Sequence, residues 1–162
     1  MHPSGAFTGG FSYMETLNYI KEVQPKYMGP RIKAPRQSSP EQVVSFLQKL
    51  LTNENKEHFI ALYLDGSNQV ISYSVVTIGI ANQSLVHPRE VFQGAILTGA
   101  CSLIVAHNHP SGNLKPSRED DSVTTRLKEA GVLLGIKLLD HIIFTSSSTA
   151  FYSYNEKGKL LL

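Results

Sequence analysis

Two histidines, His107 and His109, are the side chains of this sequence best placed to do chemistry. They end an apolar segment typical of a strand, where side chains two positions apart point to the same face of the sheet. Pro110 follows and cannot continue the hydrogen bonding of a strand, so the chain leaves the sheet there. We therefore expect both imidazoles at one edge of the sheet, within reach of solvent and substrate.

A carboxylate follows the histidines after a short loop. Pro116 and Ser117 begin a predicted helix, and Asp120 lies on its first turn. A loop of this length can fold back and bring Asp120 to the two imidazoles. Two neutral imidazoles, one carboxylate and a water are the ligands of a tetrahedral catalytic zinc site with one open position. The segment therefore predicts a zinc site formed by His107, His109 and Asp120.

Each of these residues also has a purely structural interpretation. A His-x-His pair alone is a weak signal for a metal. Ser117 and Asp120 fit the N-cap and N3 positions of a helix, where both stabilise the free N–H groups and the helix dipole. That role does not exclude metal binding, because capping also fixes the position of a ligand. Asp121 is the competing carboxylate, one position or about 100° further round the helix.

The elements that must position these residues alternate between strands and helices from Ser39 onward. Ser39 and Pro40 fit the N-cap and N1 positions of the first helix. Further helices are expected to begin at Pro88, with Ile96 on its inner face, and at Ser117, with Leu134 at the end of its apolar stripe. Strands are expected at residues 58–64, 69–80, 102–107, 138–145 and 150–154. This order predicts an α/β fold with a mixed sheet flanked by helices.

Composition limits the class of protein. Hydrophobic residues make up 41% of the 162 residues, enough for a core without disulfide or metal support, and charged residues only 17%. A net charge of +2 is too small to indicate nucleic-acid binding by itself. The single cysteine, Cys101, excludes an intramolecular disulfide and favours a reducing cytosol. No apolar run is long enough for a membrane span, and we see no signal peptide, so a cytoplasmic location is expected.

Residues 1–38 differ from the rest and are interpreted as an N-terminal leader. Residues 13–23 fit a short helix, while Pro25, Pro30 and Pro35 favour an extended segment after it. Four basic residues lie among these prolines, between Lys26 and Arg36. The simplest interpretation is a solvated linker; the alternative is a basic arm that contacts nucleic acid or a partner.

The sequence from Ser39 to Leu162 resembles a known family. The His-x-His-Pro segment, with Ser117 ten and Asp120 thirteen residues after His107, resembles the JAMM/MPN+ metalloprotease motif. The bacterial RadC-like branch of that superfamily is more similar still. Its resemblance rests on residues 107–112, 116–120 and 139–143, together with 57–59 and 88–92.

This resemblance implies a fold and a mechanism. The fold is a JAMM/MPN-like (cytidine-deaminase-like) three-layer arrangement over residues 39–162, and the cofactor is one zinc per chain. In proteolytic members a glutamate at the start of an upstream strand is the general base, which corresponds to Glu57 here, with Glu54 as the rival. Ser117 would donate a hydrogen bond to the oxyanion of the reacting carbonyl.

Other residues near these motifs have less certain roles. His141 lies in a segment, residues 139–143, that is similar to the family's sequence. It either orients a ligand or substrate or is simply packed in its strand. His58 and His87 are interpreted as structural. Cys101 is expected to be a small buried hydrophobic residue.

The function expected first is a zinc-dependent peptidase or isopeptidase acting on a peptide or protein substrate. The alternative is a nucleic-acid-binding protein of DNA repair or mobile elements that uses the metal site otherwise. Many RadC-like chains carry an N-terminal helix-hairpin-helix region, and the unpatterned segment before Ser39 does not resemble one, which weakens that alternative. A non-catalytic interaction module is the third possibility, disfavoured by the intact set of ligands.

Overall fold

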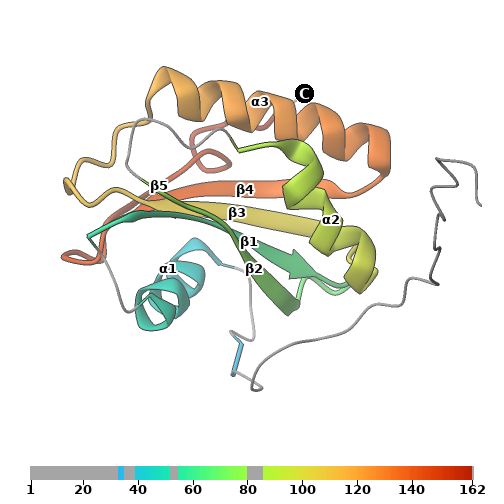
Figure 1. Ribbon diagram of the computed structural model, residues 1–162, viewed down its shortest axis with the longest axis horizontal. Helices are drawn as coiled ribbons and strands as arrows, with labels where there is room; N and C mark the ends of the chain where they lie inside the picture. The colour runs from blue at the N-terminus through green and yellow to red at the C-terminus, as the bar shows by residue number, and fades with distance from the viewer. Residues whose placement is uncertain (1–32, 35–38, 52–54, 80–85, 162) are drawn as a thin grey trace, which may run out of the picture.

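The chain forms a five-stranded mixed sheet with three helices in a computed structural model, which describes residues 33–34, 39–51, 55–79 and 86–161 (Figure 1). The strand order is β2-β1-β3-β4-β5, with β3 and β4 parallel and the other neighbours antiparallel. The elements in chain order are α1 (Pro40–Leu50), β1 (Glu57–Leu64), β2 (Val70–Gly79), α2 (Pro88–Thr98), β3 (Ser102–Asn108), α3 (Arg118–Leu134), β4 (Lys137–Phe144) and β5 (Phe151–Ser153).

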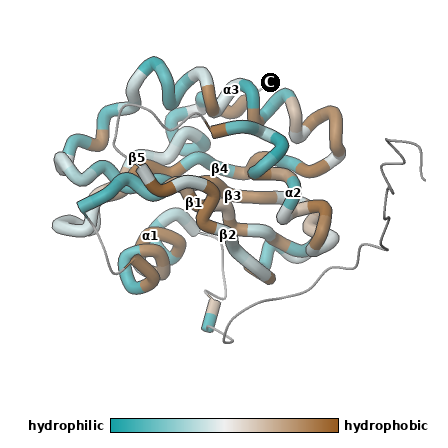
Figure 2. Tube along the Cα trace, viewed as in Figure 1, coloured by the Kyte–Doolittle hydropathy of each residue, from teal (hydrophilic) through white to brown (hydrophobic). Residues whose placement is uncertain are grey.

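Helices cover both faces of the sheet, which gives the predicted three layers. Figure 1 shows α1 on one face and α2 and α3 on the other. One apolar cluster joins α1 to residues of β1, β3 and β4, and a second joins α2 and α3 to the opposite face. Consequently β1 and β3 are buried almost throughout, and Figure 2 shows them as largely apolar strands at the centre of the sheet.

The helices begin at the residues that the sequence predicted. Ser39 accepts a hydrogen bond from the backbone N–H of Gln42, with Pro40 at the first position of α1. Pro88 opens α2 after His87, whose Nδ1 accepts from the N–H of Arg89. Ser117 is the N-cap of α3. These contacts satisfy backbone N–H groups that a helix start leaves free.

Strand parity decides which face each side chain occupies. Ile104 and Ala106 of β3 pack on the side of α1, whereas Leu103 and Val105 pack on the side of α2 and α3. His107 continues the second series, so its imidazole lies on the side of α3. Because α3 connects the parallel strands β3 and β4, its first turn returns close to the end of β3.

The structure corrects three expectations about burial. Cys101 is exposed rather than buried, because it lies in a bend and the buried strand begins one residue later, at Ser102. Ile96 is exposed because α2 turns Val91, Phe92 and Ala95 inward and Ile96 lies one position further round. Leu134 is exposed with Val132 and Leu133, and in the last turn of α3 the buried position is taken by Gly131, which lies against Phe92 of α2.

Two further expectations concern the N-terminal leader and a membrane span. The leader lies outside the described residues except at positions 33–34. Among the described helices none is long and apolar enough to cross a membrane.

Candidate metal centre

The two histidines of the motif lie together at the end of β3. His107 is the penultimate residue of the strand and is completely buried, while the side chain of His109, one residue past its end, is 16% exposed. Their Nε2 atoms are 2.9 Å apart. Their Nδ1 atoms point elsewhere: that of His107 contacts Nε2 of His141 at 2.8 Å, and that of His109 contacts the carbonyl oxygen of Asn113. Both histidines therefore present Nε2 to the same small volume.

Asp120 completes this cluster from the first turn of α3. Its Oδ1 lies 3.2 Å from Nε2 of His107, and its Oδ2 lies 3.8 Å from Nε2 of His109. Oδ2 also accepts hydrogen bonds from the backbone N–H and the hydroxyl of Ser117, both at 2.7 Å. The backbone N–H of Asp120 in turn donates to Oγ of Ser117, so the two residues form a capping box. The cap fixes the carboxylate and leaves Oδ1 directed at His107.

Electrostatics keep Asp120 ionised. Burial alone would raise the pKa of its carboxyl. The hydrogen bond and charge of His107 and the hydrogen bonds from Ser117 outweigh burial and hold the pKa well below its ordinary value. An ionised carboxylate beside two imidazole nitrogens is a suitable donor for a divalent cation.

Glu57, the first residue of β1, lies beside the same histidines. Its carboxylate and the two imidazoles each offer a donor atom within 4.8 Å of the others, so Glu57 is either a base next to the site or a further ligand. Burial raises its pKa above the ordinary value, against the lowering effect of His107 and His109 and with an additional increase from Asp120. A raised pKa suits a group that accepts a proton near neutral pH. The rival, Glu54, lies outside the described residues.

Asn108 holds the backbone on both sides of Glu57. Its Oδ1 accepts from the N–H of His58 at 2.7 Å, and its Nδ2 donates to the carbonyl of Lys56 at 3.0 Å. Asn108 is buried, and its amide ties the end of β3 to the start of β1. The sequence analysis did not single out this residue. The only signal for it in the sequence is the position of a polar residue between the two histidines, where strand alternation directs its side chain to the face opposite theirs.

We expect that Asn108→Ala destabilises the fold, because it leaves the buried N–H of His58 without its acceptor. The loss of such a partner costs roughly 1–3 kcal/mol in the free energy of unfolding. The same change frees the backbone of Glu57. Asn108→Asp is the matched control, since its carboxylate still accepts from His58 but cannot donate to Lys56. Urea unfolding of both variants measures the effect, and an unchanged stability of Asn108→Ala would contradict it.

His141 of β4 lies behind His107. It is completely buried, its ring stacks on Tyr154 with 4.9 Å between centroids, and it forms a T-shaped pair with Phe59 with 5.6 Å between centroids. Its Nδ1 lies 2.6 Å from Oγ1 of Thr124 in α3. Burial lowers the pKa of His141 well below its ordinary value, so the ring is neutral. His141 thus contacts a candidate metal ligand from the interior.

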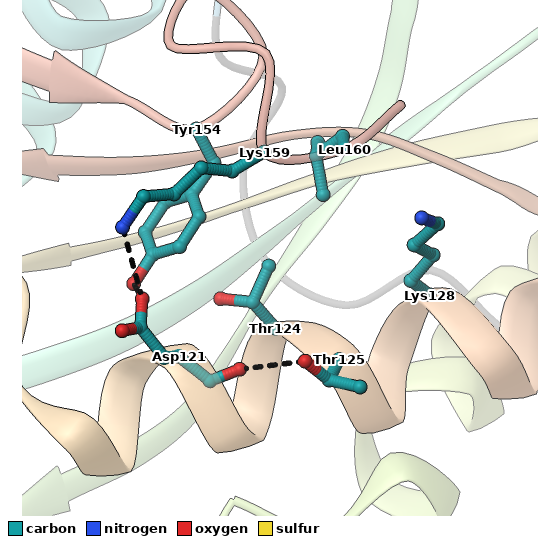
Figure 3. Close-up of a pocket in the computed structure, with 7 residues that line it drawn as sticks. All are labelled: Asp121, Thr124, Thr125, Lys128, Tyr154, Lys159 and Leu160. Atoms are coloured by element: carbon teal, nitrogen blue, oxygen red, sulfur yellow. Dashed lines mark hydrogen bonds and ion pairs between the residues drawn. The ribbon is translucent and has the colours of Figure 1, made fainter. Parts of the chain in front are cut away.

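Asp121, the competing carboxylate, points away from the histidines. Its Oδ1 accepts hydrogen bonds from the hydroxyl of Tyr154 at 2.8 Å and from Nζ of Lys159 at 3.4 Å. Figure 3 shows these three residues on one side of an open pocket, with Thr124 and Thr125 along α3. Asp121 therefore connects α3 to the C-terminal segment.

The other two histidines of the described residues, His58 and His87, have partners of their own. Nδ1 of His58 contacts the carbonyl oxygen of Lys56 at 2.8 Å. His87 is the N-cap of α2, where its Nδ1 accepts from the N–H of Arg89. These contacts agree with the structural roles expected for both residues.

The donor set at the end of β3 fits a zinc ion. Tetrahedral zinc with bonds of about 2.0–2.1 Å places neighbouring N and O ligands roughly 3.3 Å apart. The distances from His107 Nε2 to His109 Nε2 and to Asp120 Oδ1 are 2.9 and 3.2 Å. Side-chain exposures of 16% for His109 and 14% for Asp120 leave the cluster accessible from one side. Residues 107, 109 and 120 thus form a compact set of one carboxylate and two imidazoles.

Comparison with known proteins shows which proteins this chain is similar to. A family model described as the RadC-like JAB domain matches residues 37–159. A UPF0758 protein of Methanosarcina mazei is 52% identical over 106 residues, which cover 65% of this chain and 46% of that protein. UPF0758 proteins of Bacillus licheniformis (51% identical, 75% of this chain, 53% of that protein) and Geotalea uraniireducens (43%, 86% and 60%) are also similar. The chain spans about half the length of these relatives.

Proposed function

Because the chain belongs to the family of RadC-like JAB domains, we propose that it is a zinc-dependent hydrolase of peptide or isopeptide bonds. The observation that supports this most strongly is the convergence of His107, His109 and Asp120 next to Glu57. Two imidazoles, a fixed carboxylate and a neighbouring carboxylate of raised pKa are the groups that metal-dependent hydrolysis requires.

His107, His109 and Asp120 would hold the zinc, through Nε2 of each histidine and Oδ1 of the aspartate. A bound zinc would supply a water of lowered pKa and polarise the carbonyl of the substrate. The protein fixes these donors from behind: the carbonyl of Asn113 holds His109, His141 holds His107, and Ser117 holds Asp120. Such outer contacts orient ligands and increase metal affinity.

Glu57 would act as the general base and then as the general acid. Its carboxylate accepts the proton of the attacking water and later delivers it to the amine that leaves when the C–N bond breaks. Burial supports this role by raising the pKa of Glu57, and the Asn108 clamp holds its backbone. Carboxylates of this kind contribute roughly 10²–10⁴ in rate.

Ser117 would contribute a hydrogen bond to the developing oxyanion. Its hydroxyl is engaged with Oδ2 of Asp120 in this structure, so this role requires the O–H to turn toward the substrate. The backbone N–H of Ser117 also donates to Oδ2, which would keep Asp120 in place during such a turn.

Incubation of the purified protein with a proteome-derived peptide library tests the proposed activity. We expect cleavage products with the zinc-loaded protein and none after chelation with dipicolinate. Asp120→Asn is the inactive control. Products that appear equally with wild type and Asp120→Asn would overturn the assignment of the site.

Removal of the metal is expected to leave the fold intact but less stable. The two apolar clusters contain none of the proposed ligands and are built mainly from strand and helix residues, unlike the core of a zinc finger. Far-UV circular dichroism before and after chelation should therefore show the same helix and strand content, with a lower melting temperature. A coil spectrum after chelation would show that the site is structural instead.

A further inference from the structure

The two edges of the sheet end in different kinds of strand. β5 forms one edge with the short segment Phe151–Ser153, and the turn that follows carries three charged residues, Glu156, Lys157 and Lys159. β2 forms the other edge with the longer segment Val70–Gly79 (Figure 1). The outer side of an edge strand presents N–H and C=O groups to any further strand, and proteins protect it by short length, charge or proline. β5 is protected by its length and by the charges next to it.

β2 has neither charge nor proline. The sequence contains no Asp, Glu, Lys or Arg at positions 66–88 and no proline at positions 66–87, although 17% of all residues are charged. Three aliphatic side chains of β2 are exposed, Ile71 by 41%, Val75 by 40% and Ile78 by 58%. In the described part of the chain no strand lies beyond β2. An uncharged, aliphatic edge of this length is suited to pairing with another strand.

The side chains of Tyr73 and Val75 lie on the face of the sheet that α1 covers. Val75 is opposite Ile60 of β1, which packs in the same apolar cluster as α1, and opposite residues of neighbouring strands share a face. Tyr73 packs against that cluster, and its ring forms an edge-to-face pair with Phe46 of α1 with 6.5 Å between centroids. β2 therefore extends the apolar face beside α1 to the edge of the sheet.

Two bulges limit the part of β2 that can pair with a further strand. Ile71 and Val76 have no partner residue in β1 and are extra residues of β2. Bulges of this kind twist an edge and disrupt pairing locally. Between them, Ser72–Val75 pair with β1 without a shift in register. The outer side of this segment is the regular part of the edge.

We propose that β2 pairs with β2 of a second copy of this chain, antiparallel and about a two-fold axis, so that two five-stranded sheets join into one. A two-fold axis perpendicular to the sheet continues the α1 face of one copy into the α1 face of the other. Residues directly opposite each other must then share a face. A register centred on Ser74 meets this condition, because Ser74 faces its own copy and Tyr73 faces Val75 of the second copy. Pairs of an aromatic and a β-branched residue stabilise antiparallel strands.

The absence of charge favours a second copy of this chain as the partner. In a symmetric interface the same patch meets itself, so a charged strand would bring like charges together, and β2 carries no charge. An uncharged edge also offers no complement to a charged peptide or a nucleic acid. Two-fold dimers are the commonest oligomers of soluble proteins. The inference does not rest on the proposed function, and the metal centre at the end of β3 lies two strands in from this edge.

Substitution of Val75 by lysine tests the pairing. Val75→Lys places two ammonium groups close together across the two-fold axis, so the dissociation constant of the dimer should rise more than about 100-fold. Leu133→Lys is the matched control, because Leu133 is the most exposed large hydrophobic residue of the described chain, at 87%, and lies in α3 rather than at the edge. Sedimentation equilibrium should show dimers for wild type and Leu133→Lys. Circular dichroism of each variant measures whether it is folded.

Hydrogen–deuterium exchange of the wild type tests the same pairing without a substitution. Every second N–H of Ser72–Val75 points away from β1 and has a strand partner only when a further strand pairs with the edge. These outward amides should exchange slowly in the dimer and rapidly after dilution to the monomer, whereas the inward amides remain slow at both concentrations. This result distinguishes strand pairing from contacts between side chains alone.

Several results would overturn the inference. A wild type that is monomeric at every concentration does so, as does a folded Val75→Lys that dimerises as tightly as wild type. A dimer that is lost in Leu133→Lys and kept in Val75→Lys would place the interface at the end of α3 instead. Outward amides of β2 that stay protected after dilution would show that a segment of the same chain covers the edge. If Val75→Lys does not fold, the exchange experiment on the wild type still decides.

Discussion

Glu57→Gln is expected to lower the rate of peptide-bond cleavage by roughly 10²–10⁴ while leaving zinc content and melting temperature close to those of the wild type. The amide has nearly the shape of the carboxylate but cannot accept a proton at neutral pH. Its backbone position is set by Asn108 through Lys56 and His58, and the substitution does not touch these contacts. Rate and zinc content should be measured on the same preparation, with a substrate from the peptide library.

Glu54→Gln is the control that separates the two glutamates. If Glu54→Gln loses activity while Glu57→Gln retains it, the base has been assigned to the wrong residue. If both variants remain fully active, the general base is a different group. Loss of zinc from Glu57→Gln would identify Glu57 as a ligand, which its position within 4.8 Å of the histidine donor atoms also permits.

The strand and the helix start that position the site could be predicted because strand alternation and helix capping depend only on residues close together in the sequence. Alternation along β3 places His107 on the side of α3, and the start of α3 at Ser117 follows from capping chemistry. The structure confirms the structural interpretation of Ser117 and Asp120, a capping box at the start of α3, and this geometry is compatible with the proposed metal binding. The capping box holds Oδ2 of Asp120 and leaves Oδ1 directed at His107.

Local sequence patterns could not identify the residues that contact the site from behind, Thr124, Asn108 and His141, because their partners are distant in the sequence. Thr124 is an ordinary helix residue until β4 places His141 against it, 17 residues later. Asn108 clamps a segment 50 residues before it. His141 was identified only as a residue that either orients a ligand or is packed in its strand, and its contact with His107 favours the first role.

The predicted burial of Leu134 and Cys101 was wrong, and both residues lie at or next to the end of a helix or strand. Apolar periodicity placed Leu134 on the inner face of α3, but periodicity does not tell how far the neighbouring layer extends. Cys101 has a similar explanation, since the boundary between a bend and a buried strand lies between it and Ser102. Errors of this kind concern the periphery of the fold and leave the metal centre unaffected.

Replacement of a proposed zinc ligand should have the largest effect on metal binding. We expect His109→Ala to lose the zinc that wild type retains at about one per chain, with an affinity reduced by more than about 100-fold, since partners behind the ligands already contribute roughly 10–100-fold. The fold should persist, because His109 lies after the end of β3 and its side chain is partly exposed. Elemental analysis after dialysis measures the metal content, and His87→Asn is the matched control, since asparagine preserves the cap of α2.

Asp120→Asn extends the same experiment to the carboxylate. Its amide oxygen can still accept from the N–H of Ser117, so the start of α3 should be retained while the negative charge facing His107 is lost. Zinc loss from His109→Ala and Asp120→Asn, with retention in Glu57→Gln and His87→Asn, would assign the ligands to His109 and Asp120 and the base to Glu57. Equal zinc in wild type and His109→Ala would refute the assignment of His109 as a ligand and with it the proposed ligand set of His107, His109 and Asp120.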